Sequence, residues 1–255
     1  MAFYAYKTDV GIKKNINQDA LLIKEATAQD GKIYLLVVCD GMGGLSYGEV
    51  ASKMVIDAFN NWFDSRIGFV LAKDDMQYTV TNEWNQLLNK VNVEILEYGN
   101  DRNVQLGTTC TSLLILPSKQ YVFFHAGDTR LYKLNSSGIQ QLTQDHTVIA
   151  KELLEGKITE EEALVDPRRN MLLQAVGASE YLDIQTGYGA VSESDMYMIC
   201  CDGFRHKLSE KELYENLMVD DISDETSLTT KLTALVEENK KRGEKDNITA
   251  IAIKF

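Results

Sequence analysis

Five aspartates of this 255-residue chain stand where strand-like runs begin or end, and together they could hold a metal ion. They are Asp19, Asp40, Asp128, Asp202 and Asp246. Four of them have a Gly or Asn neighbour, so each one alone is readily explained as a turn residue. Taken together they predict several carboxylates at one end of a sheet. Such a cluster repels itself unless cations neutralise it, and ligation by oxygen alone suits Mg²⁺ and Mn²⁺.

The segment 35–44, LLVVCDGMGG, shows most directly a carboxylate placed beside a buried strand. Its first five residues indicate a buried strand, which Asp40 then ends before the glycine-rich residues 41–44. A charge at the end of an apolar strand is costly unless it is paired or bound to a metal. From this stretch alone, a turn that caps a helix remains the competing interpretation.

Two hard cations a few ångströms apart would lower the pKa of a bridging water and would also neutralise a phosphate. The residues by themselves leave open a metallohydrolase and a metal-dependent phosphotransferase. A nucleotide kinase is less favoured, because the sequence has no Gly-rich loop ending in Lys-Ser or Lys-Thr.

Charge and composition exclude some classes of partner. The net charge of −12 argues against nucleic acid and anionic membranes, which require basic surfaces. No apolar run is long enough to predict a membrane span, and the first residues do not resemble a secretory signal. The four cysteines have the spacing of neither a zinc site nor a disulfide framework. We therefore expect buried thiols and a cytoplasmic protein.

The elements that must position the aspartates are short strands and amphipathic helices. Strand-like patterns occur at 20–27, 32–39, 110–117, 120–127, 129–136, 195–201 and 248–255. Short polar turns join several of them, which predicts antiparallel hairpins.

Apolar stripes with helical spacing run through 47–63 and 75–98, and the Ser209 to Glu212 pattern predicts a capped helix start. Another helix is expected to end at Gly243. Helices of this one-sided kind predict an α+β fold in which helices cover sheets. No linker is visible, so we expect a single domain over residues 1–255.

Seven motifs, in this order, resemble those of the metal-dependent serine/threonine protein phosphatases of the type 2C class, in their bacterial form. They are TDVGIKKNINQDALL, VCDGMGG, GTTCTSLLIL, HAGDTRLYKL, LTQDHTV, ICCDGF and DNITAIAI. The resemblance extends from about residue 8 to residue 255. It implies a four-layer α-β-β-α sandwich of two antiparallel sheets flanked by helices. It also implies a flap beside the site at about 147–178, in which Arg168 and Arg169 are candidates for contacting substrate.

The resemblance also implies a metal centre of two, or in bacterial members three, Mn²⁺ or Mg²⁺ ions. Asp19 and Asp40 would hold the pair, with Asp40 bridging both ions and Gly41 offering its carbonyl. The other ligands and catalytic residues would be Asp202 and Asp246. A third, weaker ion would bind Asp128 together with Asp202.

The implied reaction is hydrolysis of phosphoserine and phosphothreonine in proteins by a metal-bridging hydroxide, without a phosphoenzyme. The expected partners are phosphorylated proteins, which a separate Ser/Thr kinase would supply. Two alternatives remain at this point. One is a catalytically weak pseudophosphatase that binds phosphoproteins, and the other is a hydrolase of small phosphorylated metabolites.

The chain departs from the family pattern at several positions. Lys14 stands where the family usually has an Arg that binds the substrate phosphate, so the fork of a guanidinium is replaced by a point charge. Met42 stands where some members have a His proposed as the proton donor. Arg205 and His206 make the loop after Asp202 more basic than usual, and we expect that loop to be exposed to solvent.

Overall fold

Two antiparallel β-sheets, packed face to face, form the middle of the protein in the computed structural model, which describes residues 2–43 and 47–255. The first sheet has the strand order β1 (Phe3–Asp9), β11 (Ile248–Lys254), β10 (Met196–Cys200), β7 (Arg130–Asn135), β8 (Gly138–Gln141). The second has the order β2 (Asp19–Ala28), β3 (Gly31–Gly43), β5 (Cys110–Ile115), β6 (Gln120–Ala126), β9 (Gln185–Ala190), and β4 (Leu106–Thr108) pairs with the end of β3.

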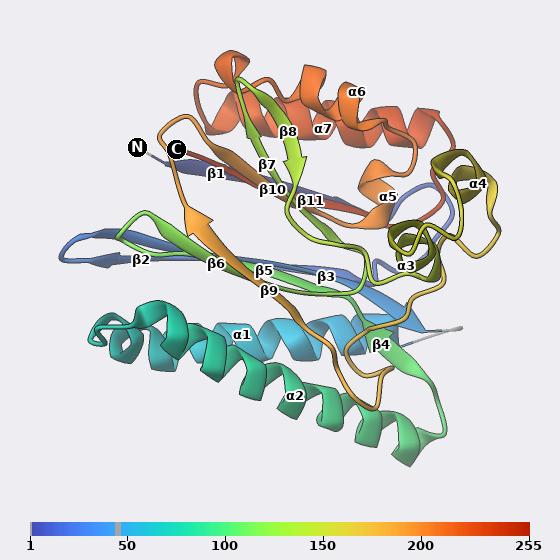
Figure 1. Ribbon diagram of the computed structural model, residues 1–255, viewed down its shortest axis with the longest axis horizontal. Coiled ribbons are helices and arrows are strands. Elements are labelled where there is room, and N and C mark those ends of the chain that lie inside the picture. Colours follow the sequence, from blue (N-terminus) through green and yellow to red (C-terminus); the bar gives the residue numbers. More distant parts are fainter. Residues whose placement is uncertain (1, 44–46) are drawn as a thin grey trace.

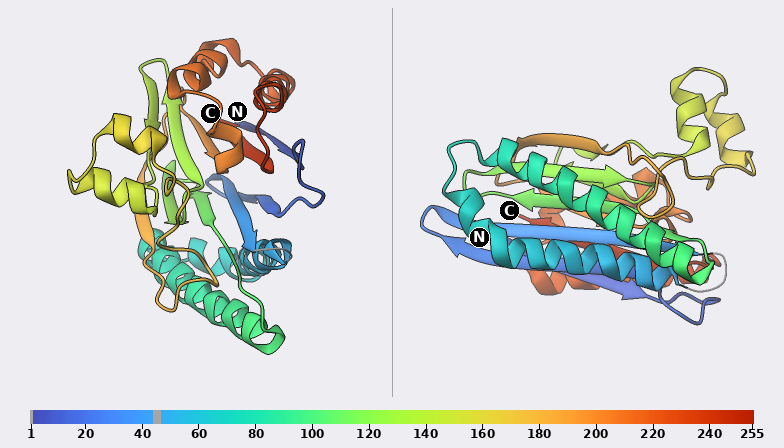
Figure 2. Two further views of the ribbon diagram at one scale, coloured as in Figure 1. Left: turned by 90° about the vertical axis from the view of Figure 1, so that its right-hand side faces the viewer. Right: turned by 90° about the horizontal axis from the view of Figure 1, so that it is seen from below.

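Helices cover the outer faces of both sheets (Figure 1). The second sheet carries α1 (Gly48–Leu71) and α2 (Met76–Arg102), and the first carries α5 (Asp202–Arg205), α6 (Glu210–Asn216) and α7 (Glu225–Lys241), with a 3₁₀ turn at Val219–Asp221. Helices α3 (Val148–Leu154) and α4 (Glu160–Val165) project from one end of the sandwich (Figure 2). The predicted α+β sandwich of four layers is confirmed.

Strand β3 shows how the sequence builds these layers. Successive side chains of a strand point to opposite faces. Leu35, Val37 and Cys39 pack against α1 and α2, whereas Leu36 and Val38 pack between the sheets. Every residue from 33 to 39 is buried, which explains why this strand is continuously apolar.

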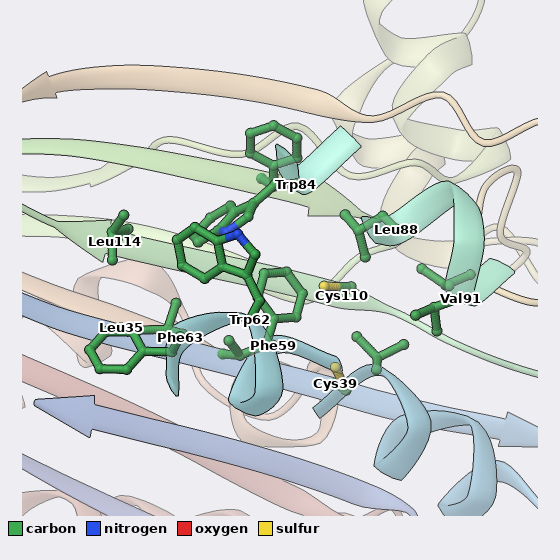
Figure 3. Close-up of a cluster of buried hydrophobic side chains, with 14 of the residues drawn as sticks. Leu35, Cys39, Phe59, Trp62, Phe63, Trp84, Leu88, Val91, Cys110 and Leu114 are labelled. Carbon is green, nitrogen blue, oxygen red and sulfur yellow. The ribbon is translucent and has the colours of Figure 1, made fainter. Parts of the chain in front are cut away.

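The core under the two long helices is aromatic (Figure 3). The indole of Trp84 meets the rings of Phe59, Trp62 and Phe124 edge to face, at centroid distances of 5.0, 5.3 and 5.4 Å. Such contacts add to the free energy gained by burying the rings. The sheet that carries Asp19 and Asp40 is thereby supported from behind by a closely packed layer.

Strand β3 does not end at Asp40, and in this respect the sequence interpretation was wrong. The strand continues to Gly43, and its last three residues pair with β4 instead of β5. Gly41 allows this because a Cβ there would lie 2.2 Å from the carbonyl oxygen of Gly48 and 2.5 Å from that of Gln18. Gly44 lies outside the described residues.

The helices are longer than their apolar stripes predicted. Helix α1 continues to Leu71 and α2 to Arg102, whereas the stripes ended at 63 and 98. The capping box of Ser209 and Glu212 is present at the start of α6. Within the described residues, no helix combines the length and the apolar character that a membrane span requires.

Candidate metal centre

Asp19 and Asp40 form the centre of the carboxylate cluster. Asp19 is the first residue of β2 and stands directly opposite Asp40 of β3 in the antiparallel register. Both continue the alternation that points Leu21 and Val38 between the sheets, so they lie on the inter-sheet face at the end of the sandwich. One oxygen of each and the Sγ of Cys201 lie within 4.8 Å of one another.

Asp202 and Asp246 are contributed by the opposite sheet, where β10 and β11 lie side by side. Asp202 begins α5, one residue after the end of β10, and Asp246 precedes β11. The glycine after Asp202 is required by a close approach, because a Cβ on Gly203 would lie 2.0 Å from the carbonyl oxygen of Asn247. The two Asp-Gly pairs of the cluster, at Asp40 and Asp202, thus have one physical reason: each glycine lets another backbone pass beside the cluster.

Burial raises the pKa values of the clustered carboxyl groups. It brings the pKa of Asp19 to about 7 and that of Asp202 to about 6, with the neighbouring carboxylates adding to both shifts. Burial, and then the charge of Asp19, raise the pKa of Asp40 well above its ordinary value. Burial also brings the pKa of Asp128 to about 7. In the absence of a cation, these groups therefore resist becoming charged together.

The cluster fits a pair of hard divalent cations. Among the described residues, both carboxylate oxygens of Asp19 and Oδ1 of Asp202 are buried without a hydrogen-bond partner. Buried carboxylate oxygens usually have a partner or a bound ion. Carboxylate oxygens, with the Gly41 carbonyl nearby, are the ligands that Mg²⁺ and Mn²⁺ prefer.

Lys14 lies beside the cluster, with its Nζ 2.9 Å from Oδ1 of Asp246. The loop that carries it is fixed by the buried Asn247. The Nδ2 of Asn247 donates to the carbonyl oxygens of Val10 and Ile16, at 3.0 and 3.2 Å, and its Oδ1 accepts from the N–H of Gln18 at 2.9 Å. Asn247 therefore fixes the loop between β1 and β2 to the start of β11.

A cavity of about 550 Å³ opens in front of the cluster. Lys14, Asp40, Asp128, Asp202 and Asp246 line it, together with Gly41, Met42 and Thr109. The opposite wall comes from the predicted flap and the turn after it, at Asn170, Leu172, Leu173, Gln174, Ala175, Ala178 and Ser179.

The two halves of the flap pair with each other, and its C-terminal end also pairs with the body of the protein. Thr147 pairs with Leu172 across the base of α3 and α4, and Val176 pairs with Thr108 of β4. This pairing returns the chain to the cavity after α4. The predicted flap segment therefore contributes to the site through its second half, while its helices project outward (Figure 2).

Arg205 is enclosed, so the expectation of a solvent-exposed loop at Arg205 and His206 was wrong. Residues 202–205 form α5, and Arg205 Nη2 lies 3.6 Å from Oδ2 of Asp128 and 3.5 Å from Oδ2 of Asp145. The same Nη2 donates to the Asp128 carbonyl oxygen at 2.9 Å. His206 Nε2 lies 3.4 Å from Oδ2 of Asp202. Asp128, which the resemblance assigns to a third ion, thus faces a fixed cation of this chain.

Three residues outside the predicted set of ligands complete the site. Thr109 accepts the backbone N–H of Asp40 at 2.9 Å, and Cys201 places its thiol beside Asp19. Arg205 was noticed only as a charge. The GTTC motif and the Cys before Asp202 were signals for the first two, but which carboxylate Arg205 faces depends on tertiary packing.

The sequence of the chain matches that of known phosphatases. Residues 12–243 match the family described as protein phosphatase 2C. Protein phosphatase PhpP of Streptococcus pneumoniae is 30% identical over 96% of this chain and 94% of its own length. Serine/threonine phosphatase stp of Listeria innocua is 29% identical over 97% of this chain and 94% of its own length.

Solved structures agree with this match. Serine/threonine phosphatase Stp1 from Staphylococcus aureus has a TM-score of 0.85 at 29% identity, with 100% of this chain and 95% of that chain covered. The catalytic domain of the phosphatase PstP, solved with two manganese ions, has a TM-score of 0.79 at 25% identity and covers 99% of this chain and 97% of its own. The chain belongs to the protein phosphatase 2C family of serine/threonine phosphatases.

Proposed function

We propose that this chain hydrolyses phosphoserine and phosphothreonine in proteins, using two Mn²⁺ or Mg²⁺ ions held by Asp19, Asp40, Asp202 and Asp246 with the carbonyl of Gly41. One observation carries the proposal most strongly: Asp19 and Asp202 have buried carboxylate oxygens without partners, and Asp202 lines an open cavity together with Lys14. When bound, such ions supply a nucleophilic water at neutral pH and offset the charge of the phosphate, which permits hydrolysis without a phosphoenzyme.

Lys14 binds the substrate phosphate in this proposal. Its ammonium stands at the wall of the cavity, beside Asp246. An ammonium attracts phosphate as a point charge, whereas a guanidinium would hold two oxygens in a fixed plane. We therefore expect the phosphate to be less rigidly oriented than an arginine would hold it.

No cysteine of the chain is suited to form a phosphoenzyme. All four are free and buried, and burial raises the pKa of Cys200 to about 12 and that of Cys201 well above its ordinary value. A thiolate is needed for nucleophilic attack. The four buried thiols also support placing the enzyme in a reducing compartment, the cytoplasm.

The leaving alkoxide receives its proton from water in this proposal. Met42 lines the cavity at the position where some relatives have a His, and its thioether side chain has no ionisable proton to donate. The rate should therefore depend more strongly on the acidity of the leaving group. The substrates are phosphoproteins, which the similarity to PhpP and stp supports. In this proposal a separate Ser/Thr kinase phosphorylates them.

Two ions, rather than three, are proposed for this chain. The guanidinium of Arg205 already faces Asp128, so a third cation would compete with a charge fixed in the fold. Because Arg205 is enclosed and lies beside Asp128, we propose that this side chain, and not an added ion, neutralises the Asp128 carboxylate.

The test is phosphate release from a phosphothreonine peptide, with Mn²⁺, with EDTA and by Asp202→Asn. We expect release that requires Mn²⁺ and falls at least about a hundredfold in the variant, a barrier change of about 3 kcal/mol. If folded protein binds the peptide and releases no phosphate at any Mn²⁺ or Mg²⁺ concentration, the chain is a pseudophosphatase. Faster hydrolysis of small phosphorylated metabolites than of any phosphopeptide would contradict the substrate class.

A further inference from the structure

A second cavity, of about 430 Å³, adjoins the candidate metal centre. Lys14, Asn170 and Asp246 line both this cavity and the larger one, so the two are neighbours that share a wall. A substrate whose phosphate reached the metal centre would therefore have its flanking residues within reach of the second cavity.

Four segments that are distant in the sequence bring cations to this second cavity. Lys13 comes from the loop between β1 and β2, Arg169 from the flap, Lys207 from the turn after α5, and Lys245 from the turn before β11. All four side chains are exposed. We call these four residues the cationic rim.

The cationic rim carries charge that the protein itself does not neutralise. Most of the other lysines and arginines lie within 4.0 Å of a carboxylate oxygen, whereas none of these four has such a partner among the described residues. The chain as a whole has a net charge of −12, so this group of unpaired positive charges contrasts with the acidic character of the protein. Like charges held together without partners favour an anionic ligand.

The carboxylates at the second cavity are already engaged. Asp246 pairs with Lys14 at 2.9 Å. Glu244 is buried and accepts the backbone N–H groups of Lys245 and Asp246 through its Oε1, at 2.7 and 3.0 Å. Its other oxygen lies 3.8 Å from His206 Nδ1. Five cationic side chains, those of the cationic rim and Lys14, line the cavity against these two acids, so positive charge remains in excess.

We propose that the second cavity is a subsite for a second anionic group of the phosphoprotein substrate, a carboxylate or a phosphate close to the phosphorylated residue. This inference rests on the proposed function. An extended peptide advances about 3.3–3.6 Å per residue, so an acidic side chain within about three residues of the phosphothreonine can enter it. The preferred substrates are thus acidic phosphopeptides.

The experiment compares kcat/KM for phosphothreonine peptides that differ at one position within three residues of the phosphate, scanned on both sides. That position holds Glu or Gln in one arm, and phosphotyrosine or Tyr in the other. We expect a preference of about tenfold or more for the anionic member at the best position. A preference only in the second arm would assign the subsite to phosphate, and a preference for Glu would assign it to acidic side chains.

Variants test whether the cationic rim causes the preference for anionic peptides. Lys13→Gln, Lys207→Gln and Lys245→Gln combined should reduce the preference to near unity, and Arg169→Gln alone should reduce it in part. The matched control combines Lys53→Gln, Lys90→Gln and Lys211→Gln, which changes the net charge equally at side chains that are 71, 78 and 82% exposed. The control should keep the preference, because its lysines lie on exposed helix surfaces away from the cavity.

The possible failures are distinguishable. If wild-type protein hydrolyses anionic and neutral peptides equally, the subsite is wrong and the proposed function stands. If the triple variant of the cationic rim keeps the preference for anionic peptides, the anion subsite does not lie at the second cavity. If no phosphopeptide is hydrolysed at all, the proposed function itself fails.

Discussion

Asp19 and Asp40 face each other as direct cross-strand neighbours of β2 and β3, on the inter-sheet side of the second sheet. Like charges directly opposite each other destabilise an antiparallel pair. The sequence therefore places an unfavourable pair directly after the buried run 33–39 of β3. A bound cation reverses the sign of this interaction.

We predict that Mn²⁺ raises the melting temperature of the wild-type protein, because it binds only the folded state. Asp40→Asn should melt higher than wild type in EDTA and should lose the increase with Mn²⁺. Asp30→Asn, in an exposed turn, is the control that changes the charge without touching the pair. If Asp40→Asn melts lower than wild type in EDTA, repulsion between Asp19 and Asp40 does not destabilise the metal-free fold.

Lys14→Ala should lower kcat/KM for a phosphothreonine peptide by about ten- to a hundredfold. A hydrogen bond to a charged group is worth about 1.5–3 kcal/mol, and the variant removes the one that we propose for the phosphate. Lys14→Arg should retain or raise the activity, since the guanidinium can bind two oxygens. Equal activity of the Ala variant and wild type would exclude Lys14 from phosphate binding.

Gly203→Ala should destabilise the fold by about 1–3 kcal/mol, because the added methyl meets the backbone oxygen of Asn247 at 2.0 Å. Gly68→Ala is the matched control: it lies in α1 and has no atom within 4 Å of the added Cβ. That control should be stabilising by about 0.5–1 kcal/mol, since alanine favours a helix interior. Urea unfolding of the three proteins in EDTA measures both effects.

Asp128→Asn should leave the number of bound Mn²⁺ ions at two, because Arg205 rather than an ion faces this carboxylate. Calorimetric titration and metal analysis of the folded variant give the number. Three ions in wild type and two in the variant would establish the third site and remove the role that we give to Arg205.

The buried His125 should contribute a pH-dependent loss of stability. Burial lowers its pKa to about 3, and its Nε2 lies 3.1 Å from the carbonyl oxygen of Gln144. In the unfolded chain the pKa of a histidine is about 6.5. At pH values between these two pKa values, the unfolded state therefore binds a proton that the folded state does not bind. The stability of the fold falls as the pH drops below about 6.5.

Replacing His125 by Gln should remove this contribution. The free energy of unfolding, measured with urea in EDTA at pH 7.5, 6 and 5, should fall more steeply with decreasing pH for wild type than for His125→Gln. The slope is the readout, because the substitution also lowers the stability at every pH through lost packing. Parallel slopes would mean that the imidazole is protonated in the folded protein.

Much of the fold was predictable because its strands carry strong local signals. The uninterrupted apolar run of β3 and the capping box at Ser209 depend on neighbours in sequence, and the structure has both. Strand β9, with the sequence QTGYGA, was not predicted, since its glycines leave no alternating apolar pattern.

The carboxylates of the site could be predicted, but their partners could not. Asp40 and Asp202 are marked by the glycine beside each, which the chain needs wherever another backbone passes close. Arg205 looked like a surface charge, because nothing in its neighbouring residues reveals that Asp128 and Asp145 lie against it. The four lysines and arginines of the cationic rim come from segments that only tertiary folding brings together.

The position of β11 has a consequence for how the enzyme is made. This strand lies between β1 and β10, and the adjacent Asn247 fixes the loop that carries Lys14. A ribosome synthesises residues 248–254 after the other described strands, so β1 must wait until then for β11, its one sheet neighbour among the described residues. Asp19 and Asp246, which we propose as metal ligands, can meet only at that stage. A nascent chain would therefore be inactive as a phosphatase until β11 has been translated.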